Sequence, residues 1–207
     1  SGKKRSFRRL QFMSFRIEEK LFIKSENLIA FKEYLINKPS KQIYHPRIIK
    51  SLYFDNLNLE MYKDSLEGLT PRKKIRIRSY PNENDKNLYL EIKTSSVEGR
   101  FKTREIIDKN KFEIFEKSGY FDNQYGLCFP NVSVLYKREY FQLDDMRISI
   151  DSELSYENNS SKIKCKDFNS IVEIKTSIKK NLDDLSESFP FQKIRFSKYC
   201  FAVENLA

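Results

Sequence analysis

Glycine, cysteine, histidine and tryptophan are scarce in this 207-residue chain, and the scarcity excludes several classes of site. With 5 glycines, the sequence contains neither G-x-x-x-x-G-K-[ST] nor G-x-G-x-x-G, which excludes the two common nucleotide-binding loops. The 3 cysteines, Cys128, Cys165 and Cys200, are far apart and form no C-x-x-C pair, which argues against a disulfide scaffold and a structural zinc site. The single histidine, His45, precedes Pro46 in an expected turn and is interpreted as a loop residue rather than a catalytic one.

Long apolar segments are also missing from the sequence. No run approaches the ~18 apolar residues of a membrane span, and no secretory signal pattern opens the chain. Scattered, unpaired cysteines suit a reducing compartment, so a cytoplasmic location is expected. The length suits one domain, predicted over residues 13–207. Residues 1–12 are interpreted either as a flexible basic arm or as a cloning remnant ahead of a native start at Met13.

What the sequence has in excess is positive charge. It contains 39 Lys and Arg residues against 29 Asp and Glu residues, which gives a formal net charge of +10. Five of these bases fall within residues 1–12, so about half of the excess remains in the body of the chain. A surplus of this size favours an anionic partner.

Hydrophobic periodicity predicts an α+β domain dominated by antiparallel strands. Alternation of apolar and polar residues predicts eight strands, at residues 15–23, 48–55, 71–80, 88–95, 100–107, 132–143, 146–151 and 170–176. Helical spacing predicts helices at residues 25–38, 58–66, 109–118, 182–188 and 198–206. Residues 119–131 are expected to be irregular. We expect the strands to close into an eight-stranded antiparallel β-barrel with the helices packed outside it.

The polar faces of the expected strands are strongly basic. They carry twelve bases, Arg16, Lys20, Lys74, Arg76, Arg78, Lys93, Arg100, Lys102, Arg104, Arg138, Arg147 and Lys175, against four acids, Glu18, Glu91, Asp151 and Glu173. A solvent-facing sheet also alternates apolar and polar residues, but like charges opposite one another destabilise a sheet. We therefore interpret this face as the lining of a lumen that binds a polyanion. Since the bases would repel one another, removing Arg76 or Arg78 is expected to leave the ligand-free protein as stable or more stable.

Nine short motifs occur along the chain in a characteristic order: FRIEEK, SLYFDN with a downstream YKDSLEG, RKKIRIRSY, LEIKT, FKTRE, VLYKREYF, RISID, VEIK and FSKYC. In this order they resemble VTC domains, the polyphosphate polymerase domains of the triphosphate tunnel metalloenzyme superfamily, over about Phe15 to Phe201. The resemblance implies a tunnel of eight antiparallel strands that binds triphosphate through inward basic residues and one catalytic divalent metal.

The resemblance also assigns roles to residues of this chain. The residues expected to act in catalysis are Lys20, Arg76, Arg78, Lys93, Lys102, Arg138 and Lys198. Those expected to bind substrate, with Arg104 and Lys175 added from the basic strand faces, are Arg104, Tyr136, Arg147, Lys175 and Ser197. Glu173 matches the metal-binding glutamate, and Glu18 is a second candidate ligand for Mn²⁺ or Mg²⁺. Arg16 stands where the wider superfamily begins E-x-E-x-K, which favours the polymerase branch and weakens the case for Glu18.

Several of these residues have plainer interpretations that stay open. Tyr136 could simply pack in the core, and Ser197 could serve only as the N-cap of the helix that follows it. The SLYFD motif is interpreted as structural, with Tyr53 and Asp55 anchoring the next helix.

The function implied is metal-dependent transfer of the γ-phosphoryl group of ATP to a growing inorganic polyphosphate chain. One alternative is a hydrolase of triphosphate or nucleoside triphosphates on the same fold, and another is a non-catalytic polyphosphate-binding module. The carboxylates among the bases and the enclosed lumen argue against a nucleic-acid partner, because acids would repel it. No membrane span is expected in this chain.

Overall fold

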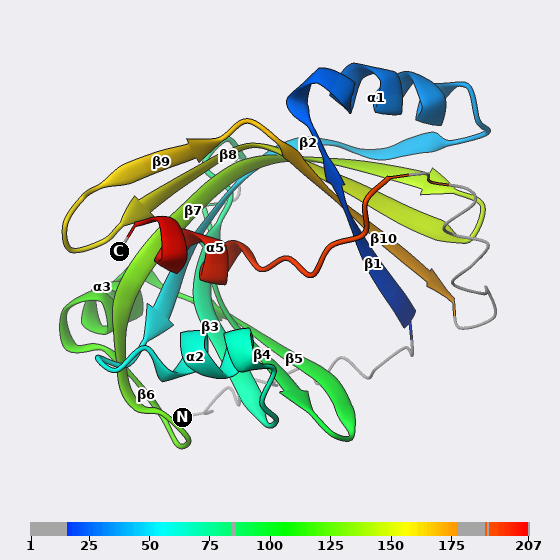
Figure 1. The fold of residues 1–207 in the computed structure, drawn as a ribbon. Coiled ribbons are helices and arrows are strands. Elements are labelled where there is room, and N and C mark those ends of the chain that lie inside the picture. The colour runs from blue at the N-terminus through cyan, green and yellow to red at the C-terminus, as the bar shows by residue number, and fades with distance from the viewer. Residues whose placement is uncertain (1–15, 84–85, 178–188, 190, 207) are drawn as a thin grey trace, which may run out of the picture.

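A computed structural model describes residues 16–83, 86–177, 189 and 191–206, so the basic segment 1–12 and the helix expected at 182–188 lie outside the described residues. The chain forms one large antiparallel sheet that curls around a concave face (Figure 1). Its strands follow the order β1 (Arg16–Ile23), β10 (Ser170–Ser177), β8 (Met146–Asn158), β7 (Gly126–Leu143), β2 (Lys41–Asp55), β3 (Arg72–Ser79), β4 (Leu88–Ser96) and β5 (Gly99–Ile107). Two short strands extend it: β6 (Tyr120–Asp122) pairs with β7, and β9 (Lys164–Asp167) pairs with β8.

The prediction of a closed eight-stranded barrel is wrong, because β1 and β5 end the sheet without pairing with each other. The free edge of β1 is occupied by the segment that precedes the last helix. The Phe22 N–H donates to the Gln192 carbonyl at 3.0 Å, and the Ile194 N–H donates to the Lys20 carbonyl at 2.9 Å. These backbone groups are thus unavailable to β5, and the ten-stranded sheet stays open. Across the opening, the described parts of the two strands meet through side chains: Arg100 of β5 lies 3.7 Å from Glu18 of β1.

Two helices cover the convex face of the sheet, as the sequence predicts. Helix α1 (Leu28–Ile36), which follows a short 3₁₀ turn η1 (Ser25–Asn27), buries Phe31 and Leu35 against β1, β7, β8 and β10. Helix α3 (Lys109–Ser118) packs Phe112 near the outward residues Leu52 and Ile77. Apolar side chains gather under these helices because a strand has a period of two, so that every second side chain points to the same face.

The other two described helices depart from the expectation that all helices lie outside. Helices α2 (Glu60–Glu67) and α5 (Lys198–Asn205) lie together at one end of the concave face (Figure 1). Asp55 fixes α2 there, since its carboxylate accepts from the N–H groups of Met61 and Tyr62 at 3.0 and 2.9 Å. It also accepts from the hydroxyl of Tyr199 in α5. The interpretation of Asp55 as a structural anchor is therefore confirmed.

The strands are longer and more numerous than the alternation predicts. Residues 119–131, expected to be irregular, contain β6 and the start of β7. Strand β2 begins at Lys41, before the expected turn at His45, and strand β9 was not expected at all. No described helix is both long and apolar enough to cross a membrane.

Candidate functional site

The concave face of the sheet encloses a cavity of about 890 Å³, and residues of α2 and α5 contribute to its lining. All fourteen residues that the sequence assigns to the site line this single cavity. Among the described lining residues are sixteen Lys and Arg side chains against five Glu side chains, so the cavity has a large positive excess. Like charges in this enclosure repel one another, and bound anions would relieve that repulsion.

The strand alternation places the cavity side chains as expected. Ile75 and Ile77 are 0% and 3% exposed on the convex side, while Arg76 and Arg78 between them line the cavity. The antiparallel register then brings Arg76 opposite Glu91, and Glu91 opposite Arg104.

Glu91 is the centre of a buried cluster of cations. One of its oxygens accepts from Arg76 Nε and Nη2 at 2.9 and 2.7 Å, and the other accepts from Lys102 Nζ at 2.6 Å. Arg78 and Arg104 approach it at 3.6 and 3.7 Å. Burial alone would raise the pKa of Glu91, but Arg76, Arg78 and Lys102 hold it well below its usual range. One ionised carboxylate thus holds four cations in place.

Asp151 makes a second cluster of the same kind on the opposite side of the cavity. Its carboxylate accepts from Arg138 Nη2 at 2.7 Å and from the Lys198 ammonium, and only 1% of its surface is exposed. Burial favours the neutral acid, yet Arg138 and Lys198 lower the pKa of Asp151 and keep it ionised. Arg138, buried beside this carboxylate, has a pKa raised well above its usual value despite its burial.

A row of three lysines has less of this compensation, since Lys102 alone among them pairs with a carboxylate of the described residues, that of Glu91. Lys74, Lys93 and Lys102 face one another across β3, β4 and β5 in adjacent register positions. Enclosure in the cavity, and the nearby Arg76, lower the pKa of Lys93 to about 7. Enclosure also lowers the pKa of Lys102, to about 8, although Glu91 opposes the shift. Among the described residues, Lys93 and Lys74 have no carboxylate within ion-pair distance, so they are free to bind an anion.

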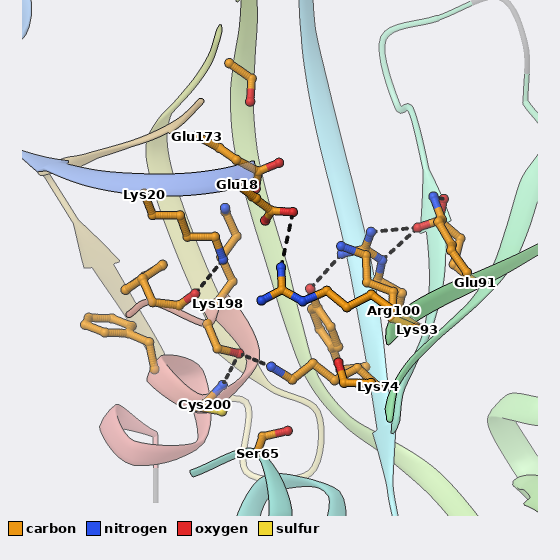
Figure 2. A pocket seen from close by; sticks show the side chains of 18 of the residues that line it. Glu18, Lys20, Ser65, Lys74, Glu91, Lys93, Arg100, Glu173, Lys198 and Cys200 are labelled. Carbon is orange, nitrogen blue, oxygen red and sulfur yellow. Dashed lines mark hydrogen bonds and ion pairs between the residues drawn. The ribbon is translucent and has the colours of Figure 1, made fainter. Parts of the chain in front are cut away.

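Two carboxylates, Glu18 and Glu173, lie on the same face of the adjacent strands β1 and β10 (Figure 2). Lys175 Nζ lies 2.8 Å from Glu173 and 4.0 Å from Glu18. Burial would raise the pKa of Glu173, but Lys175, Arg138 and Lys20 hold it well below its usual range. Glu173 is therefore ionised and able to act as an oxygen ligand.

The donor set suits a divalent metal that is shared with phosphate. No group of three or more His, Cys, Asp or Glu side chains gathers around a common point in the described part of the chain. Mg²⁺ and Mn²⁺ are commonly held by one or two carboxylates together with substrate phosphates and water. Glu173 and Glu18 fit that requirement and would not make a complete metal cage by themselves.

The contacts of Tyr136 and Ser197 show which of their alternative interpretations apply. Tyr136 is buried, but its hydroxyl accepts from Arg78 Nη2 at 3.2 Å and its ring lies under the Lys198 ammonium at 4.7 Å, so it orients two cations as well as packing. Ser197 is the N-cap of α5, as its oxygen accepts from the Cys200 N–H at 3.4 Å, and it also accepts from Lys74 at 2.8 Å (Figure 2). Both side chains have structural contacts and border the cavity.

Lys20, Arg104 and Arg147 complete the predicted set. Lys20 Nζ donates to the Phe196 carbonyl at 2.6 Å, and burial lowers its pKa. Arg104 and Arg147 lie over tyrosine rings near one end of the cavity, at 3.8 Å from the ring of Tyr89 and 5.6 Å from that of Tyr140.

Sequence reasoning missed the organising role of Glu91 and Asp151, and it missed Tyr53 in the cavity. Tyr53, interpreted from the sequence as an anchor of the next helix, lines the cavity instead, and its hydroxyl accepts from Arg76 Nη1 at 2.9 Å. The hairpin register carries a signal for Glu91, since pairing β3 with β4 and β4 with β5 places it between Arg76 and Arg104. Arg195 lines the cavity from a segment outside any strand, and no pattern in the sequence indicates it.

The curled antiparallel sheet with its cation-lined concave face agrees with the tunnel fold that the resemblance to the triphosphate tunnel metalloenzymes implies. Within that class, the family model described as VTC domain matches residues 15–207, and the chain belongs to this family. No protein of curated function matches the sequence.

Solved structures agree on the fold at low sequence identity. A candidate adenylate cyclase from Bacillus halodurans superposes with a TM-score of 0.61 at 12% identity, covering 90% of this chain and 96% of its own. A candidate adenylyl cyclase from Hippeastrum, described as having a dominant triphosphatase activity, superposes with a TM-score of 0.54 at 16% identity. The match covers 92% of this chain and 96% of the Hippeastrum chain. A conserved hypothetical protein from Pyrococcus furiosus gives 0.52 at 17% identity, with 86% and 91% covered. At these identities the likeness establishes the fold.

Proposed function

We propose that this protein is a metal-dependent ATP:polyphosphate phosphotransferase, which extends inorganic polyphosphate with the γ-phosphoryl group of ATP. Membership of the VTC domain family supports the reaction type. The observation that carries the proposal is the row of Lys74, Lys93 and Lys102, where cations stand opposite one another on three strands. Phosphate oxygens bound across this row would relieve the repulsion between the three ammonium groups.

The transfer needs positioned charge more than covalent chemistry. A terminal oxygen of the polyphosphate chain attacks the γ-phosphorus, a new P–O bond forms, and the bond to the β–γ bridging oxygen breaks. The bond's electron pair leaves on the β-phosphate of ADP. Because the attacking oxygen is already anionic, no protein group has to remove a proton.

The residues held by Glu91 and Asp151 supply the fixed charge. Arg76 and Arg138 are anchored by two hydrogen bonds each to a carboxylate, so their remaining N–H groups point in set directions. Donors that are already oriented lose little entropy when charge develops on the transferred group. Lys93 and Lys74, which have no carboxylate partner among the described residues, would contact the β- and γ-phosphates.

Glu173, with Glu18 as a second ligand, would hold a divalent cation such as Mn²⁺ or Mg²⁺, which when bound neutralises phosphate charge and polarises the phosphorus. Lys175 holds Glu173 at 2.8 Å and fixes its carboxylate toward the cavity. A glutamate that is ionised without metal binds the ion without first releasing a proton.

A hydrolase on the same sheet is the second candidate, and the described triphosphatase activity of the Hippeastrum neighbour favours it. The acceptor distinguishes the two reactions, since water gives free phosphate and a chain end gives polymer. Incubation with ATP and Mn²⁺, followed by a gel stained for polyphosphate and a parallel phosphate assay, separates them. Polymer formed together with ADP supports the polymerase, while phosphate released with no polymer supports the hydrolase and contradicts our proposal.

A further inference from the structure

The two ends of the cavity differ in chemistry. Strand β3 runs from Arg72, beside α2 and α5, to Ser79 at the opposite end, and Tyr80 follows it there. At the α2–α5 end, the rings of Phe196 and Phe201 pack on each other at 5.6 Å. At the other end, arginine guanidinium groups lie beside tyrosine rings. We call this second opening the tyrosine mouth; its cavity-lining residues are Arg47, Tyr80, Arg104, Tyr140 and Arg147.

The rings and guanidinium groups of the tyrosine mouth form a set of flat surfaces. The Arg47 guanidinium lies 5.6 Å from the ring of Tyr44 and 5.8 Å from that of Tyr80. The rings of Tyr44 and Tyr140 meet edge to face at 5.4 Å. A phosphate requires charge and hydrogen-bond donors, which the lysine row already provides. Flat aromatic and guanidinium surfaces suit a planar, aromatic ligand instead.

A bulge in β2 builds this opening. The pairing of β2 with β7 shifts register between Tyr44 and Arg47, so that these residues lie opposite Tyr140 and Arg138. Residues three apart in a regular strand point to opposite faces, and the extra residue brings both side chains together. An ion pair of 2.7 Å between Arg47 Nε and Glu83 then fixes the guanidinium. Bulges of this kind re-aim side chains.

We propose that the tyrosine mouth binds the nucleobase of the donor nucleotide, stacked against Tyr80 and Arg47, with its phosphates directed inward to Arg78 and Arg76. This inference rests on the proposed function for the identity of the donor. The α2–α5 end, lined by Arg72 and Arg195, then receives the acceptor chain.

The spacing along β3 agrees with this direction of binding. Tyr80 lies four positions after Arg76, which corresponds to ~13 Å at the ~3.3 Å rise of a strand. A ribose with three phosphates in an extended form can span that length. Every base has a flat face, so stacking alone would bind adenine, guanine, cytosine and uracil nucleotides with little preference.

Calorimetric titration without divalent metal tests the proposal on the whole protein, with the imido analogue of ATP and inorganic tripolyphosphate as two separate probes. Tyr80→Leu removes the ring, and the matched control Tyr80→Phe keeps it. Arg47→Lys, in strand β2, keeps the positive charge and removes the planar guanidinium group. We expect Tyr80→Leu and Arg47→Lys to weaken the ATP analogue roughly 5- to 20-fold, while tripolyphosphate binding stays within about twofold and Tyr80→Phe behaves as the parent protein.

Any other outcome contradicts the proposal that the nucleobase binds at the tyrosine mouth, which we call the base site. Equal weakening of both probes assigns these side chains to the phosphates or to folding, and no weakening of either places the base elsewhere. A polymerase assay run beside the titration keeps the two proposals apart. Selective loss of the ATP analogue in a protein that makes no polymer supports the base site and refutes the polymerase. Polymer synthesis by a protein whose variants lose affinity for both probes equally supports the polymerase and refutes the base site.

Discussion

Replacing Lys93 by methionine tests whether the lysine row is held in place against its own repulsion. Lys93 faces Lys74 and Lys102, and burial in the cavity together with the nearby Arg76 lowers its pKa to about 7, well below the 10.5 of an ordinary lysine. The folded protein therefore binds this proton less readily than the unfolded chain does. Between pH 7 and 10.5 the unfolded state holds more protons, so stability rises with pH in this window. At pH 7 and below, the protonated Lys93 costs the folded state its full penalty.

The size of the penalty follows from the shift. Taken at face value, the fall from 10.5 to about 7 corresponds to ~5 kcal/mol. Water inside the cavity reaches Lys93 and screens its charge, so we expect ~1–3 kcal/mol. Lys93→Met should raise the free energy of unfolding by that amount at pH 6 to 7. The gain should shrink as the pH approaches 10.5.

Urea unfolding of both proteins at several pH values measures the gain, with and without tripolyphosphate. The ligand should stabilise the parent protein more than the variant, because the variant has lost one phosphate contact. Lys117→Met on the exposed surface of α3 is the control and should change stability by no more than about 0.5 kcal/mol. If Lys93→Met destabilises the ligand-free protein, Lys93 is a packing residue and the reasoning about the lysine row is refuted.

Three further changes probe other parts of the site. Glu91→Gln should cost about 3–5 kcal/mol in urea unfolding, because it leaves Arg76 buried beside a neutral group; a loss below 1 kcal/mol would mean that Glu91 does not hold the cluster. Ile75→Ala should cost about 2–5 kcal/mol of stability while leaving tripolyphosphate affinity intact in titration, and a loss of affinity without a loss of stability would reverse the assigned strand faces. Glu173→Ala should abolish ATP turnover with Mn²⁺ and leave binding of the imido analogue equal or tighter; turnover above a few percent of the parent would remove Glu173 from the metal site.

The alternation of strand β3 was sufficient to predict which of its faces lines the cavity. Ile75 and Arg76 illustrate why. Neighbouring residues of a strand point to opposite faces of the sheet, so the apolar face of the sequence pattern identifies the side chains that are buried. The same local rule could not predict the open edge. That edge depends on residues 192–194 pairing with β1, a contact between distant segments without a strand pattern.

The net charge of the strand faces also led to a wrong expectation about the stability of variants at Arg76. Counting bases against acids predicts that removing Arg76 relieves repulsion and leaves stability unchanged or improved. In the structure Arg76 donates twice to Glu91, which is 1% exposed, so its removal takes two hydrogen bonds from a buried carboxylate. We now expect Arg76→Ala to destabilise the protein. Charges that are summed along a sequence carry no information about which pairs are buried together.

Strands β1 and β5 do not pair with each other, and this bears on how the polymer of the proposed reaction would leave the site. In a barrel closed by backbone hydrogen bonds, a bound chain can move only along the axis, end first. Here the described contact across the gap is an ion pair between Glu18 and Arg100, whose side chain is 71% exposed (Figure 2). Exposed pairs of this kind contribute ~0–1 kcal/mol. Parting that contact breaks no backbone hydrogen bond between β1 and β5, so a sideways route out of the cavity is far less costly than it would be through a closed wall.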